Sequence, residues 1–338
     1  MTESNSPAAV DVDVAVIGGG PAGATAAQTL AELGHRVLLL DREGRIKPCG
    51  GAVPPKLLSE FDVPDSRLEA RVSKARMVAP SETQVDMDIG GFVGMVDRGD
   101  FDPWLRQRAA DAGAIRVTGV FESLRREPGG ALSLRYREDH KRGPQRTLRV
   151  RAVVGADGAA SRVREQALGK REKMAKVFAY HEIVKSPAGA TPDFDPARCD
   201  VYYQGEVSPD FYGWVFPHGG CTSVGAGSAV KGFSLRAAVA RMRERSGLAD
   251  SEVIRTEGAP LPLKPLRRWD NGADVLLVGD AAGTVAPSSG EGIYYGMSSG
   301  RHGGEAVSEF LATGKARALR QARRRFMAEH RIVFMILG

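Results

Sequence analysis

The sequence predicts an α/β protein in which a nucleotide-binding parallel sheet is interrupted by an inserted antiparallel-sheet domain and followed by C-terminal helices. Three apolar runs of strand length, Val12–Ile17, Ala152–Gly155 and Val275–Val278, each lead into a turn rich in glycine. Continuous apolar runs of this length are typical of parallel strands that are buried on both faces. Between the last two runs, residues 174–228 form short β-like runs separated by turns, which is typical of an antiparallel sheet.

The first apolar run opens a βαβ unit that is typical of dinucleotide sites. It is followed by the motif Gly18-x-Gly20-x-x-Gly23, by a helix expected over Ala22–Leu33, and by a second strand that ends at Asp41. The first glycine makes the tight turn, the second lets the backbone approach a pyrophosphate, and the third lets helix and strand pack closely. The helix N-terminus favours the pyrophosphate, and the acid is placed to hold ribose hydroxyls. This Rossmann-like unit alone does not separate NAD from FAD.

Composition excludes several other classes of protein. The 338 residues are 42% hydrophobic and 26% charged, and the net charge of +6 suggests mild affinity for anionic ligands or a membrane surface rather than nucleic acid. Three cysteines and six scattered histidines lack the spacing of a disulfide framework or a metal site, so we expect no metal. Residues 1–9 lack the apolar core of a signal peptide, and no run approaches the ~20 apolar residues of a membrane span. We therefore expect a cytoplasmic protein.

Two further stretches have a composition that points to a ligand. Lys47–Pro55 holds three prolines around Cys49-Gly50-Gly51, so it is a shaped loop whose backbone can approach a ligand closely. A plain surface turn is the alternative. The run Tyr212-Gly213-Trp214-Val215-Phe216-Pro217 is dense in aromatic residues, for which core packing is the alternative. If it is a strand, its three aromatic side chains share one face.

The later apolar strands also end in acids, and a helix starts near each of them. The second run leads into Gly155-Ala156-Asp157-Gly158, and the third into Gly279-Asp280-Ala281-Ala282. A glycine-rich start, with Gly290 and Gly292 just before Ile293, then opens a long helix, a pattern suited to phosphate or ribitol. Arg98 precedes another helix, expected to run to about Ala112 with Asp100 or Asp102 as its cap. Arg98 either meets a phosphate or flavin edge or is a surface residue.

Taken together, the three glycine–acid blocks resemble the FAD-dependent oxidoreductases of the aromatic hydroxylase superfamily. The resemblance implies that the first block takes the ADP pyrophosphate and the last the ribityl chain, so FAD is favoured over NAD. Two more blocks, Pro48-Cys49-Gly50-Gly51 and Tyr212-x-Trp214-x-Phe216-Pro217, resemble the paired signatures of geranylgeranyl reductases. Residues 46–61 and 279–295 most resemble the branch that acts on chlorophyll or bacteriochlorophyll. The resemblance covers residues 10 to about 334.

The motifs and the resemblance together give three sets of candidate site residues. The cofactor-binding candidates are Gly18, Gly20, Pro21, Ala22, Gly23, Asp41, Arg42, Cys49, Gly50, Gly51, Arg98, Asp157, Gly279, Asp280, Gly290, Gly292 and Ile293. The candidates for an apolar isoprenoid slot are Tyr212, Trp214, Phe216 and Pro217. The candidate proton donors are Cys49, Tyr212 and a water held by the backbone of residues 290–292.

The implied reaction is reduction of three isolated C=C bonds, which converts a geranylgeranyl group to phytyl. NADPH would reduce FAD, and FAD would pass hydride to an alkene carbon while the protein delivers a proton to the other carbon. The acceptor is left open between esterified (bacterio)chlorophyll and free geranylgeranyl diphosphate. Two alternatives are a flavin monooxygenase or halogenase on the same fold, and a prenyl-binding flavoprotein without activity.

The resemblance also sets the expected domains. Residues 10–75, 98–170 and 263–312 form parts of the FAD-binding domain, residues 76–97 and 171–262 the substrate domain, and 313–338 a C-terminal helical segment. Residues 315–331 hold seven Lys and Arg against Glu329. This tail is either a helix that lies on the inner face of a photosynthetic membrane, or a basic solvated face on a buried helix. Because the chain ends on an apolar run, Ile332–Leu337, we expect a shortened form.

Overall fold

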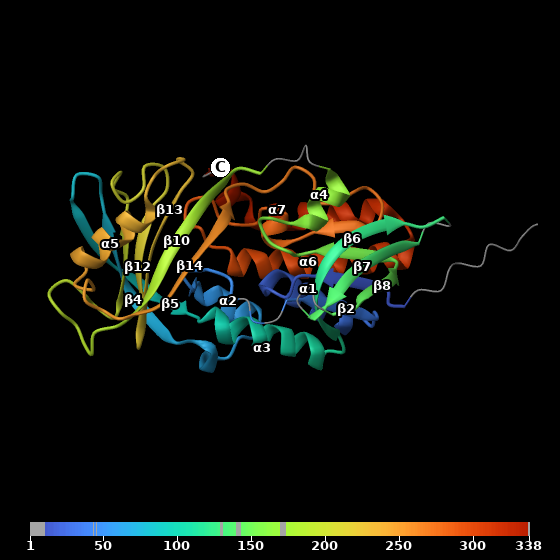
Figure 1. The fold of residues 1–338 in the computed structure, drawn as a ribbon, viewed down its shortest axis with the longest axis horizontal. Helices are drawn as coiled ribbons and strands as arrows, with labels where there is room; N and C mark the ends of the chain where they lie inside the picture. The colour runs from blue at the N-terminus through green and yellow to red at the C-terminus, as the bar shows by residue number, and fades with distance from the viewer. Residues whose placement is uncertain are drawn as a thin grey trace, which may run out of the picture. The chain divides into compact units, whose positions relative to one another are not determined.

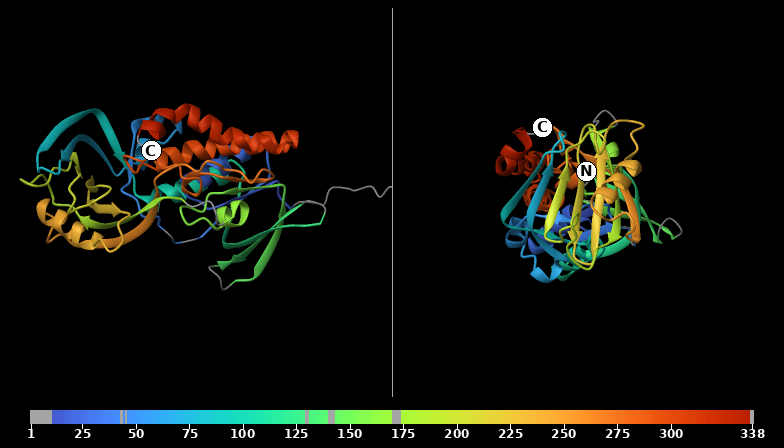
Figure 2. Two further views of the ribbon diagram at one scale, coloured as in Figure 1. Left: turned by 90° about the horizontal axis from the view of Figure 1, so that it is seen from above. Right: turned by 90° about the vertical axis from the view of Figure 1, so that its left-hand side faces the viewer.

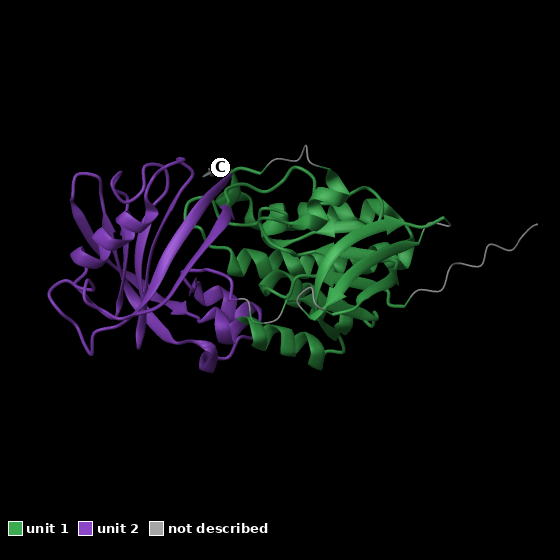
Figure 3. Ribbon diagram, viewed as in Figure 1, with its two compact units in different colours: residues 1–45, 102–175, 262–338 green, residues 46–101, 176–261 purple. Residues whose placement is uncertain are grey.

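The computed structural model describes residues 11–42, 44, 46–128, 131–139, 143–169 and 174–336. The chain divides into two compact units (Figure 3): unit 1 comprises residues 1–45, 102–175 and 262–338, and unit 2 comprises residues 46–101 and 176–261. The expected α/β fold, with a parallel sheet, an inserted sheet domain and C-terminal helices, is confirmed. The division differs from the expected domains at residues 46–75 and 98–101, which belong to unit 2 rather than to the nucleotide-binding part.

Unit 1 is built on a seven-stranded sheet (Figure 1). In spatial order its strands are β15 (Val275–Leu277), β9 (Ala152–Gly155), β1 (Val14–Ile17), β2 (Val37–Asp41), β6 (Ile115–Arg126), β7 (Leu132–Glu138) and β8 (Gln145–Val150). The strands from β15 to β6 are parallel, and β6, β7 and β8 are antiparallel. The expected hairpin between β6 and β7 is therefore present, although Gly129 and Gly130 lie outside the described residues. All three apolar runs of the sequence form neighbouring parallel strands of this sheet, β1 and β9 inside it and β15 at its edge.

The helices of unit 1 are α1 (Pro21–Glu32), α4 (Arg162–Leu168), η3 (Gly279–Ala281), α6 (Ile293–Thr313), η4 (Ala316–Leu319) and α7 (Arg320–Ile336), together with most of α3 (Arg98–Asp111). Helices α1 and α6 come close to each other at glycine residues, which have no side chain to keep the backbones apart. A Cβ atom at Gly300 of α6 would clash with the carbonyl oxygen of Ala22 in α1. One at Gly304 would lie 2.9 Å from Thr29 Cβ. The long helix α6 thus presses against the helix that follows the glycine motif.

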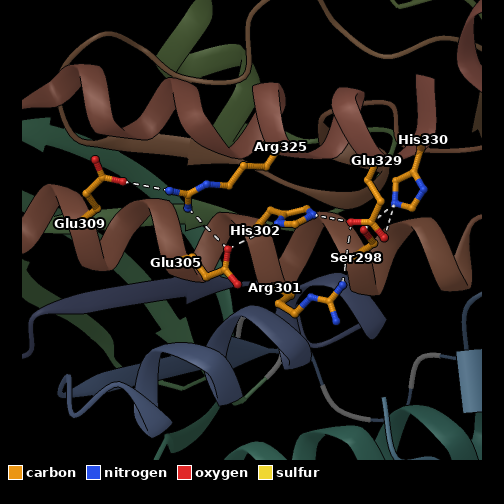
Figure 4. A network of polar contacts seen from close by, with 8 residues as sticks. All are labelled: Ser298, Arg301, His302, Glu305, Glu309, Arg325, Glu329 and His330. Carbon is orange, nitrogen blue, oxygen red and sulfur yellow. Dashed lines mark hydrogen bonds and ion pairs between the residues drawn. The ribbon is translucent and has the colours of Figure 1, made fainter. Parts of the chain in front are cut away.

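Helices α6 and α7 lie side by side (Figure 2) and are joined by a polar network (Figure 4). Glu329 of α7 accepts a hydrogen bond from His302 of α6 at 2.9 Å, and the Ser298 hydroxyl lies 2.7 Å from Nε2 of His330. His330 lies on the buried side of α7, where its ring contacts Phe326, and both Phe326 and Phe334 belong to the core of unit 1. The tail is therefore a helix with one side buried in the protein. Among the described residues, no helix has the length and apolar character to cross a membrane.

Unit 2 is built on an eight-stranded sheet. In spatial order its strands are β14 (Val253–Pro262), β10 (Lys176–Lys185), β13 (Cys221–Ser228), β12 (Gly213–His218), β11 (Arg198–Tyr202), β4 (Ala70–Val78), β5 (Gln84–Met95) and β3 (Ala52–Val53). The sheet is mixed, because β11 and β4 are parallel. Unit 2 also holds α2 (Pro55–Glu60), η1 (Asp65–Arg67) and α5 (Leu235–Arg245). Helix α5 covers one face of the sheet, where Met242 packs with Val215 and Val224.

Helix α3 starts earlier than the sequence predicts. It begins at Arg98, so Pro103, which the sequence places in the first turn, lies inside the helix. The carboxylate of Asp97 accepts the backbone N–H of Gly99 at 2.5 Å, which is the geometry of an N-cap. The expectation that Asp100 or Asp102 caps this helix is therefore wrong, because an acid one residue before Arg98 takes that role.

Candidate functional site

The glycine motif in unit 1 has the geometry of an anion site. Gly18 has φ +106°, and a Cβ atom there would clash with the carbonyl oxygen of Ala156. A Cβ atom at Gly23 would clash with Gly18 itself. Helix α1 begins with Gly20 as its N-cap, and no side chain of the described residues caps it. Its first backbone N–H groups are therefore open to an anion, and the residues present fit the pyrophosphate of a dinucleotide.

An arginine that the sequence analysis missed joins this motif to the acid at the end of β2. Arg106 of α3 donates to the carbonyl oxygen of Gly19 at 3.1 Å. Its other contact is an ion pair with Asp41, at 3.3 Å. Arg106 therefore fixes the glycine loop relative to the ribose-binding candidate. Arg42, the next residue along the chain, is exposed.

The carboxylate of Asp157 forms hydrogen bonds at the start of α4. Its carboxylate accepts hydrogen bonds from the hydroxyl of Ser161 at 2.5 Å and from the N–H of Arg162 at 2.7 Å. Burial raises the pKa of Asp157, and these hydrogen bonds oppose the rise. The carboxylate organises the turn after β9, which packs against Gly18. Any contribution of Asp157 to cofactor binding stays a prediction.

The third glycine–acid block, residues 279–282, lies beside the start of α6. The sequence patterns did not identify Glu291, which contributes to this helix start. Asp280 is buried, and its Oδ1 lies 3.8 Å from the Cβ position of Gly292. The carboxylate of Glu291 accepts the N–H groups of Ile293 at 2.9 Å and Tyr294 at 2.8 Å. Burial raises the pKa of Glu291 to about 7, although these hydrogen bonds lower it. The chain thus supplies its own anion at this helix start, so the binding roles of Gly290, Gly292 and Ile293 stay predictions.

In unit 2 the two remaining signatures, far apart in sequence, lie against each other. The aromatic side chains of Tyr212, Trp214 and Phe216 form a continuous row, with ring centroids 5.9 Å and 6.3 Å apart. A Cβ atom at Gly50 would lie 3.2 Å from Phe216 Cδ2 and 3.4 Å from Trp214 Nε1. The loop with Cys49 therefore rests on this aromatic row.

His218, which the sequence analysis did not single out, holds the loop in place. Its Nε2 donates to the carbonyl oxygen of Gly50 at 2.9 Å. Burial lowers the pKa of His218, and the Gly50 hydrogen bond opposes this effect. Gly51 has φ +75°, and a Cβ atom there would clash with the His218 ring. The Gly51 N–H also points to the sulfur of Cys49 at 3.4 Å.

Pro217 and Arg98 are two further candidates from the sequence. Strand alternation puts Pro217 on the α5 face with Val215, away from the three aromatic residues. Arg98, at the start of α3, is only 5% exposed, which is inconsistent with the surface alternative.

Among the described residues, no group of three or more His, Cys, Asp or Glu side chains could hold a metal ion.

Known proteins that resemble this chain agree with the glycine motif of unit 1 and with the loop and aromatic row of unit 2. A family described as FAD binding domain matches residues 66–329, and one described as FAD dependent oxidoreductase matches residues 13–76. Geranylgeranyl diphosphate reductase of Rhodobacter capsulatus is 52% identical over 326 residues, which cover 96% of this chain and 82% of the relative. The chain belongs to the geranylgeranyl reductase family. It is an FAD-dependent oxidoreductase.

Solved structures show how widely the geranylgeranyl reductase fold is shared. A geranylgeranyl bacteriochlorophyll reductase-like protein from Thermoplasma acidophilum has a TM-score of 0.83 at 24% identity, covering 94% of this chain and 83% of its own. A flavin-dependent brominase has a TM-score of 0.79 at 17% identity, covering 96% of this chain and 86% of its own. At these identities the likeness shows the fold alone. The reductase family membership rests on sequence.

Proposed function

We propose that this protein reduces the isolated C=C bonds of a geranylgeranyl group to give phytyl, with NADPH as the electron donor. The observation that carries the proposal is the position of the Cys49–Gly51 loop on the row of Tyr212, Trp214 and Phe216. An unconjugated alkene offers no polar handle, so an enzyme must hold it by apolar contact. The aromatic row supplies such contacts, because Phe216 is partly exposed and the buried rings of Tyr212 and Trp214 exclude water beside it.

The reaction needs a hydride equivalent at one alkene carbon and a proton at the other. FAD, when bound and reduced by NADPH, would supply the hydride equivalent. The residues of the chain hold the prenyl group, exclude water and deliver the proton. Trp214 is 5% exposed and Tyr212 8%, so this part of the sheet is nearly dry. Gly18, Gly20, Gly23, Asp41 and Asp280 are the residues we propose to hold the cofactor.

Two side chains remain candidates for the proton donor. Cys49 lies in the loop, with the Gly51 N–H directed at its sulfur, a contact that would stabilise the thiolate left after proton transfer. Tyr212 lies at the end of the aromatic row and stacks on Phe211, with ring centroids 4.4 Å apart. We favour neither over the other.

The substrate is either free geranylgeranyl diphosphate or a geranylgeranyl ester of (bacterio)chlorophyll. Incubating the FAD-loaded protein with each, under anaerobic conditions with NADPH, tests the proposal by product mass. We expect products that gain two, four and six hydrogens. Turnover only in the presence of oxygen would instead favour a monooxygenase or halogenase. No turnover with either substrate would favour a prenyl-binding flavoprotein.

We also propose peripheral contact with an anionic membrane through one side of α7. Arg320, Arg324 and Arg331 are exposed along that side, and Ile332 next to them is 73% exposed. Replacing the three arginines by serine should reduce flotation on anionic vesicles, because each basic residue near such a surface contributes about 1 kcal/mol. The matched control replaces the exposed residues Arg116, Arg146 and Arg149 of the unit 1 sheet. Equal flotation of both triple variants would contradict the proposal.

A further inference from the structure

A set of polar side chains lies behind the aromatic row on the same face of the unit 2 sheet. Trp214 of β12 is paired in register with Gly225 of β13, which is paired on its other side with His181 of β10. A Cβ atom at Gly225 would clash with the Trp214 ring and lie 2.6 Å from His181 Cβ. The absence of a side chain at Gly225 therefore leaves the space in which the indole extends across β13.

The indole ends at a buried hydroxyl group. Its Nε1–H donates to Ser223 Oγ at 3.0 Å, and the same oxygen lies 3.0 Å from Nδ1 of His181. Ser223 is fully buried and His181 is 2% exposed. Each of these polar groups therefore depends on the others for its hydrogen bonds, because water is excluded.

The direction of these hydrogen bonds is set by an acid on β14. The Nε2 of His181 lies 2.8 Å from a carboxylate oxygen of Glu257, which can only accept. In the neutral imidazole Nδ1 is then unprotonated and accepts the Ser223 hydroxyl, whose oxygen accepts the indole N–H. One orientation of every group satisfies the whole chain.

The chain of contacts continues to the start of α3. The other carboxylate oxygen of Glu257 forms an ion pair with Arg255 at 3.0 Å. Arg255 donates to Asp97 at 2.8 Å, and Asp97 is the residue that caps α3. The Trp214 indole is thus connected, first through the buried Ser223 and His181 and then through partly exposed charged groups, to the start of α3 within unit 2.

The arrangement of serine, histidine and glutamate has the connectivity of a hydrolytic triad, but its environment excludes that chemistry. Ser223 Oγ is buried, and it already accepts the indole N–H of Trp214. An attacking oxygen must reach a substrate, which this one cannot do. The group that these residues can act on is Trp214.

We propose that Ser223, His181 and Glu257 are positioning residues that fix the Trp214 indole, and that the indole in turn sets where the prenyl chain lies on the aromatic row. The proposal rests on the proposed prenyl reduction and assigns the specificity of that site. Without the Ser223 hydroxyl the indole could rotate about its side-chain bonds, and the alkene would be held in several registers. Incomplete reduction of the three double bonds should follow.

The test compares Ser223→Ala with Thr222→Val, which removes the neighbouring buried hydroxyl from the opposite face of β13. The first readout is the indole N–H resonance of Trp214 in the FAD-loaded protein, assigned by its loss in Trp214→Phe. The chain has three tryptophans, so only three such resonances occur. We expect Ser223→Ala to move the Trp214 resonance upfield and Thr222→Val to leave it in place. An unmoved resonance in Ser223→Ala would overturn the proposal.

The second readout is the reaction itself, started anaerobically from flavin reduced with dithionite so that no nucleotide donor is needed. We expect Ser223→Ala to lower kcat for alkene reduction about ten- to hundred-fold, the cost of misplacing reacting atoms by about 1 Å, and to accumulate partly reduced products. His181→Ala should shift the products in the same direction. A product distribution and kcat equal to those of Thr222→Val would show a structural role only and overturn the proposal.

A third readout separates this proposal from the proposed function. Geranylgeranyl diphosphate is titrated into the FAD-loaded wild type, Ser223→Ala and Thr222→Val, and binding is followed at the tryptophan resonances without turnover. If the wild type reduces no alkene, the proposed reaction fails, and weaker binding by Ser223→Ala than by Thr222→Val still supports positioning. If the wild type reduces no alkene and the two variants bind geranylgeranyl diphosphate with equal affinity, the positioning proposal is overturned as well.

Discussion

At Gly50 and Gly51, the absence of a side chain lets a backbone loop rest on aromatic rings. The Gly50 position faces Phe216 and Trp214, and the Gly51 position faces His218. Neither contact could be predicted from spacing, because 160 residues or more separate the partners and only the sheet brings them together. The loop and the aromatic run are two separate patterns in the sequence, and in the structure they lie against each other.

Arg106 is expected to contribute to FAD affinity although it was not identified from the sequence. Replacing it with alanine removes the hydrogen bond to Gly19 and the ion pair with Asp41. A hydrogen bond that involves a charged group contributes about 1.5–3 kcal/mol, so Arg106→Ala should weaken FAD binding at least about ten-fold. Arg108→Ala is the control, because Arg108 lies on the same helix and stacks on Trp104 instead. Equal FAD dissociation constants by fluorescence titration would contradict this role.

Cys49→Ala tests the thiol as proton donor. If Cys49 delivers the proton, its loss should lower the single-turnover rate of alkene reduction about 10²- to 10⁴-fold while the flavin is still reduced and reoxidised by air. Tyr212→Phe is the parallel variant, since it keeps the ring of the aromatic row and removes only the hydroxyl. An unchanged single-turnover rate in Cys49→Ala would eliminate the thiol and leave Tyr212 or water as the donor.

At the scale of elements, the starts of α1 and α6 differ in a way that their sequences do not reveal. Both follow a buried strand and a glycine-rich turn, so both are expected to receive an anion. The first begins at Gly20 with no side-chain cap among the described residues, whereas the second receives the carboxylate of Glu291. Glu291 lies one residue before the helix N-cap, a position at which sequence patterns do not fix the direction of a side chain.

Glu291 should make stability depend on pH. Its pKa is raised from the ordinary value of 4.5 to about 7 in the folded protein, so the folded state binds the proton more tightly than the unfolded state. Its stabilising contribution is complete below pH 4.5 and is lost as pH rises to about 7, by at most about 3 kcal/mol. Glu291→Gln keeps an acceptor for both N–H groups and should remove this part of the pH dependence. Urea unfolding at pH 5 and pH 7.5 measures it, and identical slopes in both proteins would contradict it.

The helix pair α6–α7 depends on Glu329. Burial raises the pKa of this carboxyl, but the hydrogen bond to His302 and the nearby charges outweigh that effect and lower it overall. Glu329→Ala would leave His302 without this acceptor and should cost about 1–3 kcal/mol of unfolding free energy. Glu309→Ala removes a more exposed ion pair with Arg325 in the same network and should cost at most about 1 kcal/mol. Equal losses in urea unfolding would show that the His302–Glu329 contact stabilises the helix pair no more than the Glu309–Arg325 ion pair does.

For the whole molecule, the sequence was sufficient for the fold and for the family, while the roles of the site residues stay predictions. The buried strands, the glycine motif and the aromatic run are local patterns, so their period and spacing predict them. The missed residues Arg106, His218 and Glu291 act through contacts made only in the folded chain. The division into units also differs at residues 46–75, because strand pairing of β3 with β5 draws that segment into unit 2.

The shared fold cannot decide between reduction and oxygen chemistry, because a flavin-dependent brominase has the same architecture. We propose that the aromatic row and its loop favour reduction, since they would form an apolar surface for an alkene beside a fixed backbone. We therefore expect reduced flavin in this protein to be reoxidised by a geranylgeranyl group.

The most direct measurement is anaerobic stopped-flow absorbance of the flavin near 450 nm, where oxidised flavins absorb, a property of the cofactor itself. The protein is loaded with FAD, reduced with NADPH and mixed with geranylgeranyl diphosphate or geranylgeranyl-bacteriochlorophyll. We predict recovery of the oxidised spectrum together with dihydro, tetrahydro and phytyl products by mass. Flavin that stays reduced with both substrates until oxygen is admitted would contradict the proposed function.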